Sequence, residues 1–174
     1  VLFPKELRIH KSMRSIFSQQ KFRYSIDTCF ERVMRACAET ERGGHTGSWI
    51  SESFVAAYTR LHLQGIAHSV EVWQEQELVG GLYGIALGKI FYGESMFTRV
   101  SNASKAGFIT FVQALAKTGF SLIDCQQQTT HLESLGARGI SRELFMEYLE
   151  KNVYERTLLG PWAFSKDGIV QLKK

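Results

Sequence analysis

The chain has 174 residues and a net charge of +4, and with 44% hydrophobic and 22% charged residues it can bury one core but not two. No apolar run could span a membrane, and the first residues lack the regions of a signal peptide. Three cysteines without CxxC spacing argue against a disulfide framework or a zinc site, so we expect a soluble cytoplasmic protein that binds no metal.

Most of the positive charge lies near the start of the chain. Residues 1–23 hold six basic side chains against Glu6, a local balance of +5, and the other residues sum to −1. Such a segment attracts phosphate groups by releasing counterions, so nucleic acid is a candidate partner beside the alternative of a solvated helix face. Because the chain starts with Val1 and enters an apolar-proline phrase, we expect further residues upstream.

Two helices and a strand are predicted in the first 40 residues. Residues 11–19 suit a short basic helix, and residues 21–27 alternate as a strand does. Thr28 and Glu31 have the spacing of a capping box. They predict the start of a core helix whose buried face consists of Phe30, Val33, Met34 and Cys37.

A glycine-rich loop and three strand-like runs follow. ERGGHTGSWI, residues 41–50, is predicted to be a loop that leads Trp49 to the next helix. That helix ends at Gly65 and has a face formed by Phe54, Tyr58 and Leu61. Residues 67–74 alternate, and residues 78–97 form two runs that break at Leu87-Gly88-Lys89, so antiparallel pairing is expected.

The rest of the chain predicts a crossover and a final helix. A helix within residues 101–119 stops at Gly119, and FSLID follows it as an apolar strand, a connection that usually returns the chain to the sheet. Residues 141–152 form a last amphipathic helix. This order of elements predicts an α/β (α+β) fold, a mixed sheet flanked by helices.

Two carboxylates stand at unusual positions. Glu94 lies among aromatic residues in FYGESMF, where an ion needs a partner, either an arginine of the protein or a cation on a ligand. Asp124 ends the strand SLID, where strand ends line a ligand crevice, unless it opens a turn or caps a helix near Thr129. If the chain stays extended, Gln126 points to the same side as Asp124.

Cys125 lies between these two polar residues. It invites a role as nucleophile with His68 or His131 as the base. A lone cysteine after an aliphatic run is more often buried and inert, and its side chain should point away from Asp124 and Gln126. We therefore expect Cys125 to be a packing residue.

Five phrases in the same order carry a resemblance to a known family. They are FPKELRIHKSMR, GSWI, AYTRLHLQGIAHSVEVWQEQELVGGLYG, FYGESMFTRVSNASKAGF and LIDCQ. Together they resemble the bacterial leucyl/phenylalanyl-tRNA–protein transferases over roughly residues 3–150. The resemblance implies a fold like that of GCN5-related acetyltransferases (GNAT), with a largely antiparallel sheet. Coenzyme A is not expected, because the chain lacks the pyrophosphate loop that would bind it.

The resemblance also implies a reaction. The family transfers Leu or Phe, and Met less well, from aminoacyl-tRNA to the N-terminal Arg or Lys of acceptor proteins, which creates an N-degron of the N-end rule pathway. By this resemblance the partners are aminoacyl-tRNA and acceptor proteins, with no cofactor, no membrane and a monomeric enzyme. The rival hypotheses are a CoA-dependent N-acyltransferase on the same fold and a non-catalytic tRNA-binding module.

Site residues follow from the family's motifs. Asp124 and Gln126 match its catalytic pair, and Glu94 matches its acidic pocket residue. The pocket for the Leu or Phe side chain matches Leu82, Phe91, Phe111 and Ile123, with Met96 beside them. Trp49 matches a tryptophan that stacks on the terminal adenosine of tRNA, and the cluster that meets the tRNA stem matches Lys11, Arg14, Lys21 and Arg23.

The resemblance sets the expected domain boundaries as well. Residues 1–154 are expected to form the GNAT-like aminoacyl-transferase domain, without the small N-terminal domain that the family normally carries. Residues 155–174 are expected to form a tail that packs on this domain through Trp162 and Phe164. Two departures from the family's pattern are Leu82, where methionine is common, and GSWI in place of GTWI.

Overall fold

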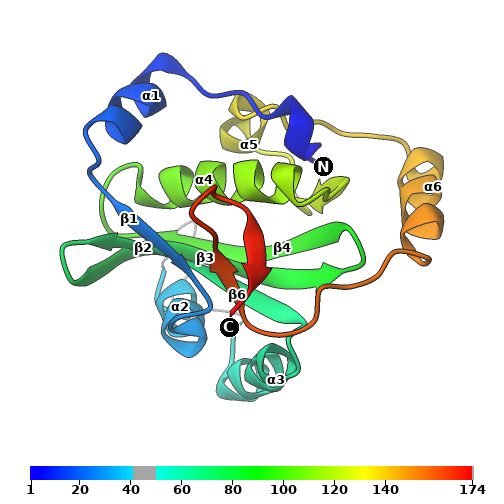
Figure 1. The fold of residues 1–174 in the computed structure, drawn as a ribbon, viewed down its shortest axis with the longest axis horizontal. Helices are drawn as coiled ribbons and strands as arrows, with labels where there is room; N and C mark the ends of the chain where they lie inside the picture. Colours follow the sequence, from blue (N-terminus) through cyan, green and yellow to red (C-terminus); the bar gives the residue numbers. More distant parts are fainter. Residues whose placement is uncertain (41–49, 174) are drawn as a thin grey trace.

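A five-stranded mixed sheet forms the centre of the protein in a computed structural model that describes residues 1–40 and 50–173 (Figure 1). Its strands lie in chain order: β1 (Arg23–Ile26), β2 (Ala67–Gln74), β3 (Glu77–Leu87), β4 (Ile90–Thr98) and β5 (Leu122–Asp124). The first three pairings are antiparallel and β4 pairs with β5 in parallel. The prediction of a mixed, largely antiparallel sheet flanked by helices is confirmed.

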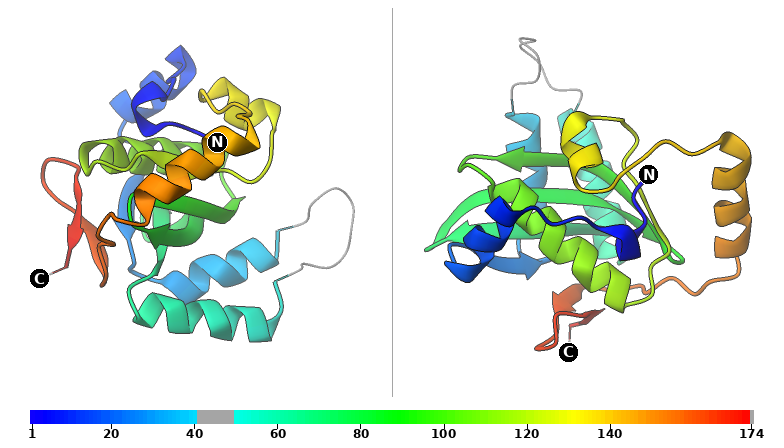
Figure 2. Two further views of the ribbon diagram at one scale, coloured as in Figure 1. Left: turned by 90° about the vertical axis from the view of Figure 1, so that its right-hand side faces the viewer. Right: turned by 90° about the horizontal axis from the view of Figure 1, so that it is seen from above.

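Helices cover both faces of this sheet (Figure 2). One face carries α4 (Ala103–Lys117), with α1 (Lys11–Ser18) and the 3-10 turn η1 (Pro4–Glu6) packed against it. The other face is covered by α2 (Phe30–Ala38) and α3 (Glu52–Leu63). The two interfaces form two separate apolar cores, so both faces of the central strands are shielded from water.

Two further helices follow β5. The helix considered near Thr129 is α5 (Thr130–Ser134), a short helix that Thr129, and not Asp124, caps. α6 (Arg142–Asn152) lies within the predicted range 141–152, and Ser141 caps its start. The helix stands away from the sheet (Figure 2). Among the helices of the described residues, none has both the length and the apolar character needed to cross a membrane.

The start of α2 corrects the predicted capping box. The helix begins at Phe30 with Cys29 as its N-cap, and no side chain caps it. Instead the carboxylate of Glu71 accepts the main-chain N–H of Thr28 at 3.3 Å, and Glu31 pairs with Arg35 at 2.8 Å. A buried carboxylate brought by β2 therefore satisfies the donors that precede the helix, and the Thr28 side chain is not needed there. The predicted apolar face of α2 is buried, as expected.

The predicted crossover positions the end of β5. Gly119, with a φ of 85°, links α4 to the segment that leads into β5. The parallel pairing then sets Asp124 beside Tyr92 of β4. On the outer side of β5, Leu2 exchanges two main-chain hydrogen bonds with Ile123, at 2.8 and 2.9 Å, so the first residues of the chain cover this edge.

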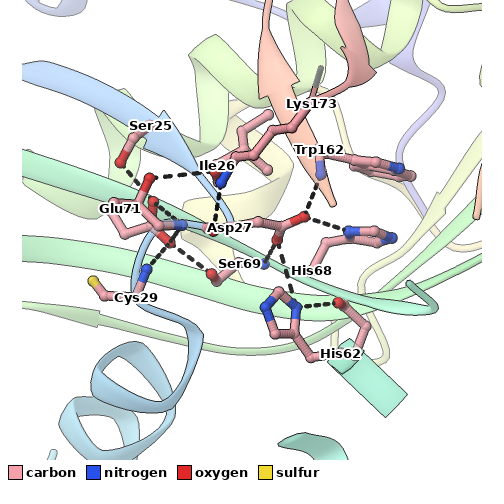
Figure 3. Close-up of polar contacts among 12 residues, drawn as sticks. Ser25, Ile26, Asp27, Cys29, His62, His68, Ser69, Glu71, Trp162 and Lys173 are labelled. Atoms are coloured by element: carbon pink, nitrogen blue, oxygen red, sulfur yellow. Dashed lines mark hydrogen bonds and ion pairs between the residues drawn. The ribbon is translucent and has the colours of Figure 1, made fainter. Parts of the chain in front are cut away.

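The tail folds into a hairpin of β6 (Trp162–Phe164) and β7 (Val170–Leu172) that is fixed by a buried carboxylate (Figure 3). Asp27 accepts the main-chain N–H of Ser69 at 2.9 Å and of Trp162 at 2.7 Å. It also lies 2.8 Å from Nδ1 of His68, while its own carbonyl oxygen accepts from Lys173 at 2.6 Å. Asp27 thus joins β1, β2 and the hairpin.

Candidate functional site

Glu94 occupies a β-bulge. In the pairing of β3 with β4, Tyr83 faces Ser95 and Gly84 faces Gly93, so Glu94 has no partner of its own on β3. A bulge inserts one extra residue, bends the strand and turns a side chain out of the normal alternation. The half-buried carboxylate of Glu94 is therefore turned toward the end of β5 by the register of the sheet, and the sequence pattern alone did not predict the bulge.

Asp124 and Gln126 lie at the end of β5, but the chain between them is not extended. Gln126 has a φ of 59°, and the Asp124 carboxylate accepts the main-chain N–H of Gln126 at 2.9 Å. This is the turn that the sequence left open as an alternative for Asp124. This turn presents the Gln126 side chain to Glu94, and the expected extended geometry is wrong.

Glu94 is held by neutral donors. Nε2 of Gln126 lies 3.4 Å from the Glu94 carboxylate. Burial raises the pKa of Tyr58, on α3, to about 12, with further contributions from the charge of Glu94 and a hydrogen bond to it. In residues 1–40 and 50–173, no arginine or lysine forms an ion pair with Glu94. Tyr58 was predicted as a core residue, and nothing local in the sequence points to this contact.

A cavity of about 270 Å³ opens beside these polar groups. Four of the predicted pocket residues line it, namely Leu82, Phe91, Met96 and Ile123, together with Asp124, Gln126 and Glu94. Phe111 lies one layer further in, with its ring 4.8 Å from that of Phe91, and Phe108 lines the wall instead. The volume is slightly below that of pockets for drug-sized ligands, which suits a single side chain.

A second hollow, of about 350 Å³, adjoins the first one. The two share Asp124, Gln126, Gln127, Thr129 and Leu132 along their common rim. Glu133, Arg138 and Arg142 line the second hollow, and Glu94 lines the first. Two ligands can therefore approach the same carboxylate and amide, one from each hollow.

Two titratable side chains near Asp124 were not predicted. Burial, and to a smaller extent the charge of Asp124, raises the pKa of Tyr92. Burial and the charge of Lys105 lower the pKa of His131, which lines the apolar cavity and is therefore neutral at pH 7. His131 was weighed from the sequence only as a base for Cys125.

Cys125 is half-buried against the core and also borders the cavity. Burial, with a smaller contribution from the charge of Asp124, raises the pKa of its thiol to about 11. The thiolate needed by a nucleophile is therefore scarce at neutral pH, which agrees with the packing role expected for it.

We expect iodoacetamide to alkylate Cys125 slowly. Relative to an ordinary thiol with a pKa near 9, a pKa of about 11 lowers the thiolate fraction at pH 8, and hence the rate, by about 100-fold. Mass spectrometry of the Cys125 peptide in the folded protein and in the same protein in denaturant measures this ratio. Equal rates in the two states would contradict the prediction.

The basic residues predicted to meet RNA lie together near α1. Lys11 and Arg14 are exposed one turn apart on α1, Lys21 lies between α1 and β1, and Arg23 is the first residue of β1. Within the described residues none of the four forms an ion pair, and the guanidinium of Arg23 lies over the ring of Trp73 at 5.3 Å. Trp49 lies outside the described residues.

The geometry offers positioning and hydrogen bonding. No group of three or more His, Cys, Asp or Glu side chains that could hold a metal ion occurs in residues 1–40 and 50–173. The side chains that line the cavity include two carboxylates, two amides, one thiol and one neutral imidazole. Such a set can orient an amine and accept its hydrogens next to an apolar side-chain pocket.

Comparison with known proteins gives matches over most of the chain. The family model for leucyl/phenylalanyl-tRNA protein transferase matches residues 1–150. Leucyl/phenylalanyl-tRNA–protein transferases from Pseudomonas fluorescens and Pseudomonas aeruginosa are each 54% identical, over 88% and 87% of this chain and 67% and 66% of their own length. The chain thus spans about two thirds of these relatives.

Solved structures give a weaker match. An aminoglycoside acetyltransferase from an uncultured soil metagenomic sample is 12% identical, with a TM-score of 0.44, over 76% of this chain and 87% of its own. A transcriptional regulator from Bacillus halodurans is 13% identical, also with a TM-score of 0.44, over 78% and 94%. The family model and the curated relatives, at more than half identity, place the chain: it belongs to the leucyl/phenylalanyl-tRNA protein transferase family.

Proposed function

We propose that the protein transfers Leu or Phe, and Met less well, from aminoacyl-tRNA to the N-terminal Arg or Lys of an acceptor protein. The observation that carries this proposal is the meeting of Glu94, Asp124 and Gln126 at the rim of an apolar cavity sized for one side chain. The family named in the comparisons supports it. Acceptor proteins modified in this way would carry an N-degron.

The reaction needs little chemical help. The aminoacyl ester is already activated, so the amine nitrogen of the acceptor forms a C–N bond with the ester carbon while the C–O bond to the ribose breaks. One amine proton ends on the ribose hydroxyl that leaves. Holding the two reactants in line and accepting hydrogens from the amine therefore supplies most of the required catalysis.

Gln126 and Asp124 have distinct parts in this proposal. A carboxylate only accepts hydrogen bonds, so the amide nitrogen of Gln126 must face Glu94 at 3.4 Å and its Oε1 faces away. That oxygen accepts a hydrogen from the attacking amine. Asp124 fixes the turn that presents Gln126, through the 2.9 Å bond to the main chain of Gln126, and also lines both hollows.

Glu94 and the cavity recognise the two amino acids that are joined. Glu94 has two neutral donors and binds the cationic side chain of the acceptor's Arg or Lys through a charge-assisted contact. The cavity lined by Leu82, Phe91 and Ile123 takes the Leu or Phe side chain. In such a pocket, one methylene more or less changes the binding free energy by only about 1–3 kcal/mol. Branched competitors are therefore excluded by the shape of the cavity.

Recognition of tRNA falls to the exposed cations near α1 and to Trp49. Lys and Arg side chains bind the RNA backbone without reading bases, so different tRNAs that bear Leu or Phe serve equally. We propose a cytoplasmic location, where aminoacyl-tRNA is found, and a protein that acts as a monomer.

The direct test is transfer of labelled Phe from Phe-tRNA to a protein that begins with Arg. It is measured for this chain and for the chain joined to the additional segment that its longer relatives have. We expect transfer to Arg and Lys N-termini and none to Ala or Asp. Absence of transfer by the longer form, or saturable tight binding of acetyl-CoA, would overturn the proposal in favour of its rivals.

Replacing Lys11 and Arg14 together with Ala is expected to weaken tRNA binding and to flatten its salt dependence. Each lost phosphate contact lowers the slope of log K against log salt concentration by about 0.9, so the double variant should lose close to two units. The measurement is tRNA affinity between low and physiological salt. Replacing Lys151 and Arg156, two cations outside the basic cluster, should leave the slope unchanged, and equal slopes in both double variants would place the RNA surface elsewhere.

A further inference from the structure

Trp162 of the C-terminal hairpin is fully buried in the same apolar core as the walls of the amino-acid cavity. Its ring stacks on that of His68 at 3.5 Å with an interplanar angle of 10° (Figure 3). It also lies 5.9 Å from the ring of Phe120 and 6.5 Å from that of Phe111. The matched family region ends at residue 150, so this tryptophan stands outside it.

The sheet register places this stack next to the cavity wall. His68 on β2 is the direct partner of Gly84 on β3, so their Cβ directions fall on the same face of the sheet. A Cβ built on Gly84 would stand 2.6 Å from Cζ of Phe91, so the Phe91 ring lies over Gly84 on that face. The stack of Trp162 on His68 and the Phe91 ring therefore occupy neighbouring positions in one layer.

Phe111 joins the two. Its ring meets that of Phe91 edge to face at 4.8 Å and lies 6.5 Å from that of Trp162. Phe91 lines the cavity, whereas Phe111 does not. In a close-packed core a ring is held in place by the atoms that pack against it. The position of Phe91 therefore depends on Phe111, and the position of Phe111 depends on the side chains that pack against it.

The hairpin that carries Trp162 is itself tied down. The main-chain N–H of Trp162 donates to Asp27 at 2.7 Å, and Lys173, just after β7, donates to the carbonyl oxygen of Asp27 at 2.6 Å. Trp162 Nε1 also donates to the carbonyl oxygen of Leu158 at 2.9 Å. With these anchors the indole ring has a fixed place in the aromatic layer.

We propose that Trp162 is a specificity-determining positioning residue, which sets the depth of the amino-acid cavity by supporting Phe111 and, through it, Phe91. This inference rests on the proposed function. A smaller side chain at position 162 lets the two phenylalanine rings move back and deepens the cavity. A deeper cavity favours the longer Phe side chain over Leu.

The test measures kcat and KM for Leu-tRNA and Phe-tRNA in Trp162→Leu and in the milder Trp162→Phe. We expect the ratio of kcat/KM for Leu to that for Phe to fall by about 3- to 10-fold in Trp162→Leu and less in Trp162→Phe, an effect below that of a whole methylene. Most of the change should lie in KM, because the reacting groups at Asp124 and Gln126 are untouched.

Val170→Ala is the matched control. Val170 is buried in β7 of the same hairpin, so this change loosens the tail without altering the Trp162 ring. The Leu-to-Phe ratio should stay constant in Val170→Ala, even where stability falls as much as in Trp162→Phe. An unchanged ratio in Trp162→Phe, or the same change in Val170→Ala, overturns the inference, whereas absence of any transfer by the unaltered protein overturns the proposed function instead.

A double-mutant cycle tests the route through Phe111. Trp162→Phe and Phe111→Leu act on one packing contact, so their effects on the Leu-to-Phe ratio should be non-additive. Binding of leucinamide and phenylalaninamide, followed by NMR shifts, gives the same comparison without turnover. Additive effects in both measurements would show that Trp162 does not act through Phe111.

Discussion

Asp124→Ala is expected to lower the turnover of aminoacyl transfer by about 10²- to 10⁴-fold, the range for loss of a group that handles a proton or positions one. The change removes the acceptor of the Gln126 main-chain N–H, so the turn that presents Gln126 is lost as well. Single-turnover transfer of Phe gives the rate, and filter binding gives tRNA affinity. Affinity should change by no more than about threefold, because it comes mainly from contacts with the RNA backbone.

Asp124→Asn separates the two parts that Asp124 could take. Its amide oxygen can still accept the N–H of Gln126, but the negative charge is gone. If Asp124 acts by holding the turn, the Asn variant retains most of the rate and Gln126→Ala loses it. Loss of the rate in Asp124→Asn, with the turn preserved, would assign the proton to Asp124 itself. Equal losses in rate and tRNA affinity in Asp124→Ala would contradict both.

Asp27→Ala is expected to lower the free energy of unfolding by about 3–5 kcal/mol, the cost of removing one partner from a buried charged network. The carboxylate of Asp27 accepts from the main chain of Ser69 and Trp162 and lies beside Nδ1 of His68, and all three groups are buried. Without it these donors lose their partners in a region closed to water. Urea unfolding at neutral pH, followed by tryptophan fluorescence, measures the loss.

Two comparisons sharpen this prediction. Asp27→Asn keeps one oxygen that can accept a hydrogen bond, but its amide nitrogen replaces the other oxygen and faces a donor that it cannot pair with. The decrease in the free energy of unfolding should therefore be measurable but smaller than that of Asp27→Ala. Asp167→Ala changes an exposed carboxylate in the same hairpin region and should stay within about 0.5 kcal/mol of the unaltered protein. A similarly small effect for Asp27→Ala would mean that the hairpin is not held by this network.

Much of the fold could be predicted from local patterns. The helices corresponding to α1, α2, α3, α4 and α6, the strands β1 to β5 and the crossover all follow from apolar spacing and from glycines at element ends. These signals extend over one or two turns of chain, so one sequence suffices to find them. The hairpin of β6 and β7 was not predicted, because its strands have three residues each.

The capping box of Thr28 and Glu31 shows the limit of local patterns. The spacing was correct, but Glu71 reaches the same donors from 43 residues further along the chain. The buried Glu71 carboxylate, which the hydroxyls of Ser25 and Ser69 hold at 2.6 Å, competes successfully with a side-chain cap that water can replace. A pattern that spans only a few residues does not include Glu71, so it cannot predict which acceptor these main-chain donors find.

The features of the candidate site likewise fall into those that the sequence determines and those that depend on the tertiary structure. The sequence by itself determined the order of elements, the residue types at the end of β5 and, through whole motifs, the family. Only the tertiary structure decided that Glu94 stands in a bulge, that Gln126 turns back toward it, and that Tyr58 contacts Glu94 and Trp162 packs near Phe111 from distant segments. The physical reason is that register and side-chain packing depend on contacts between residues far apart in the chain, which local periodicity does not encode.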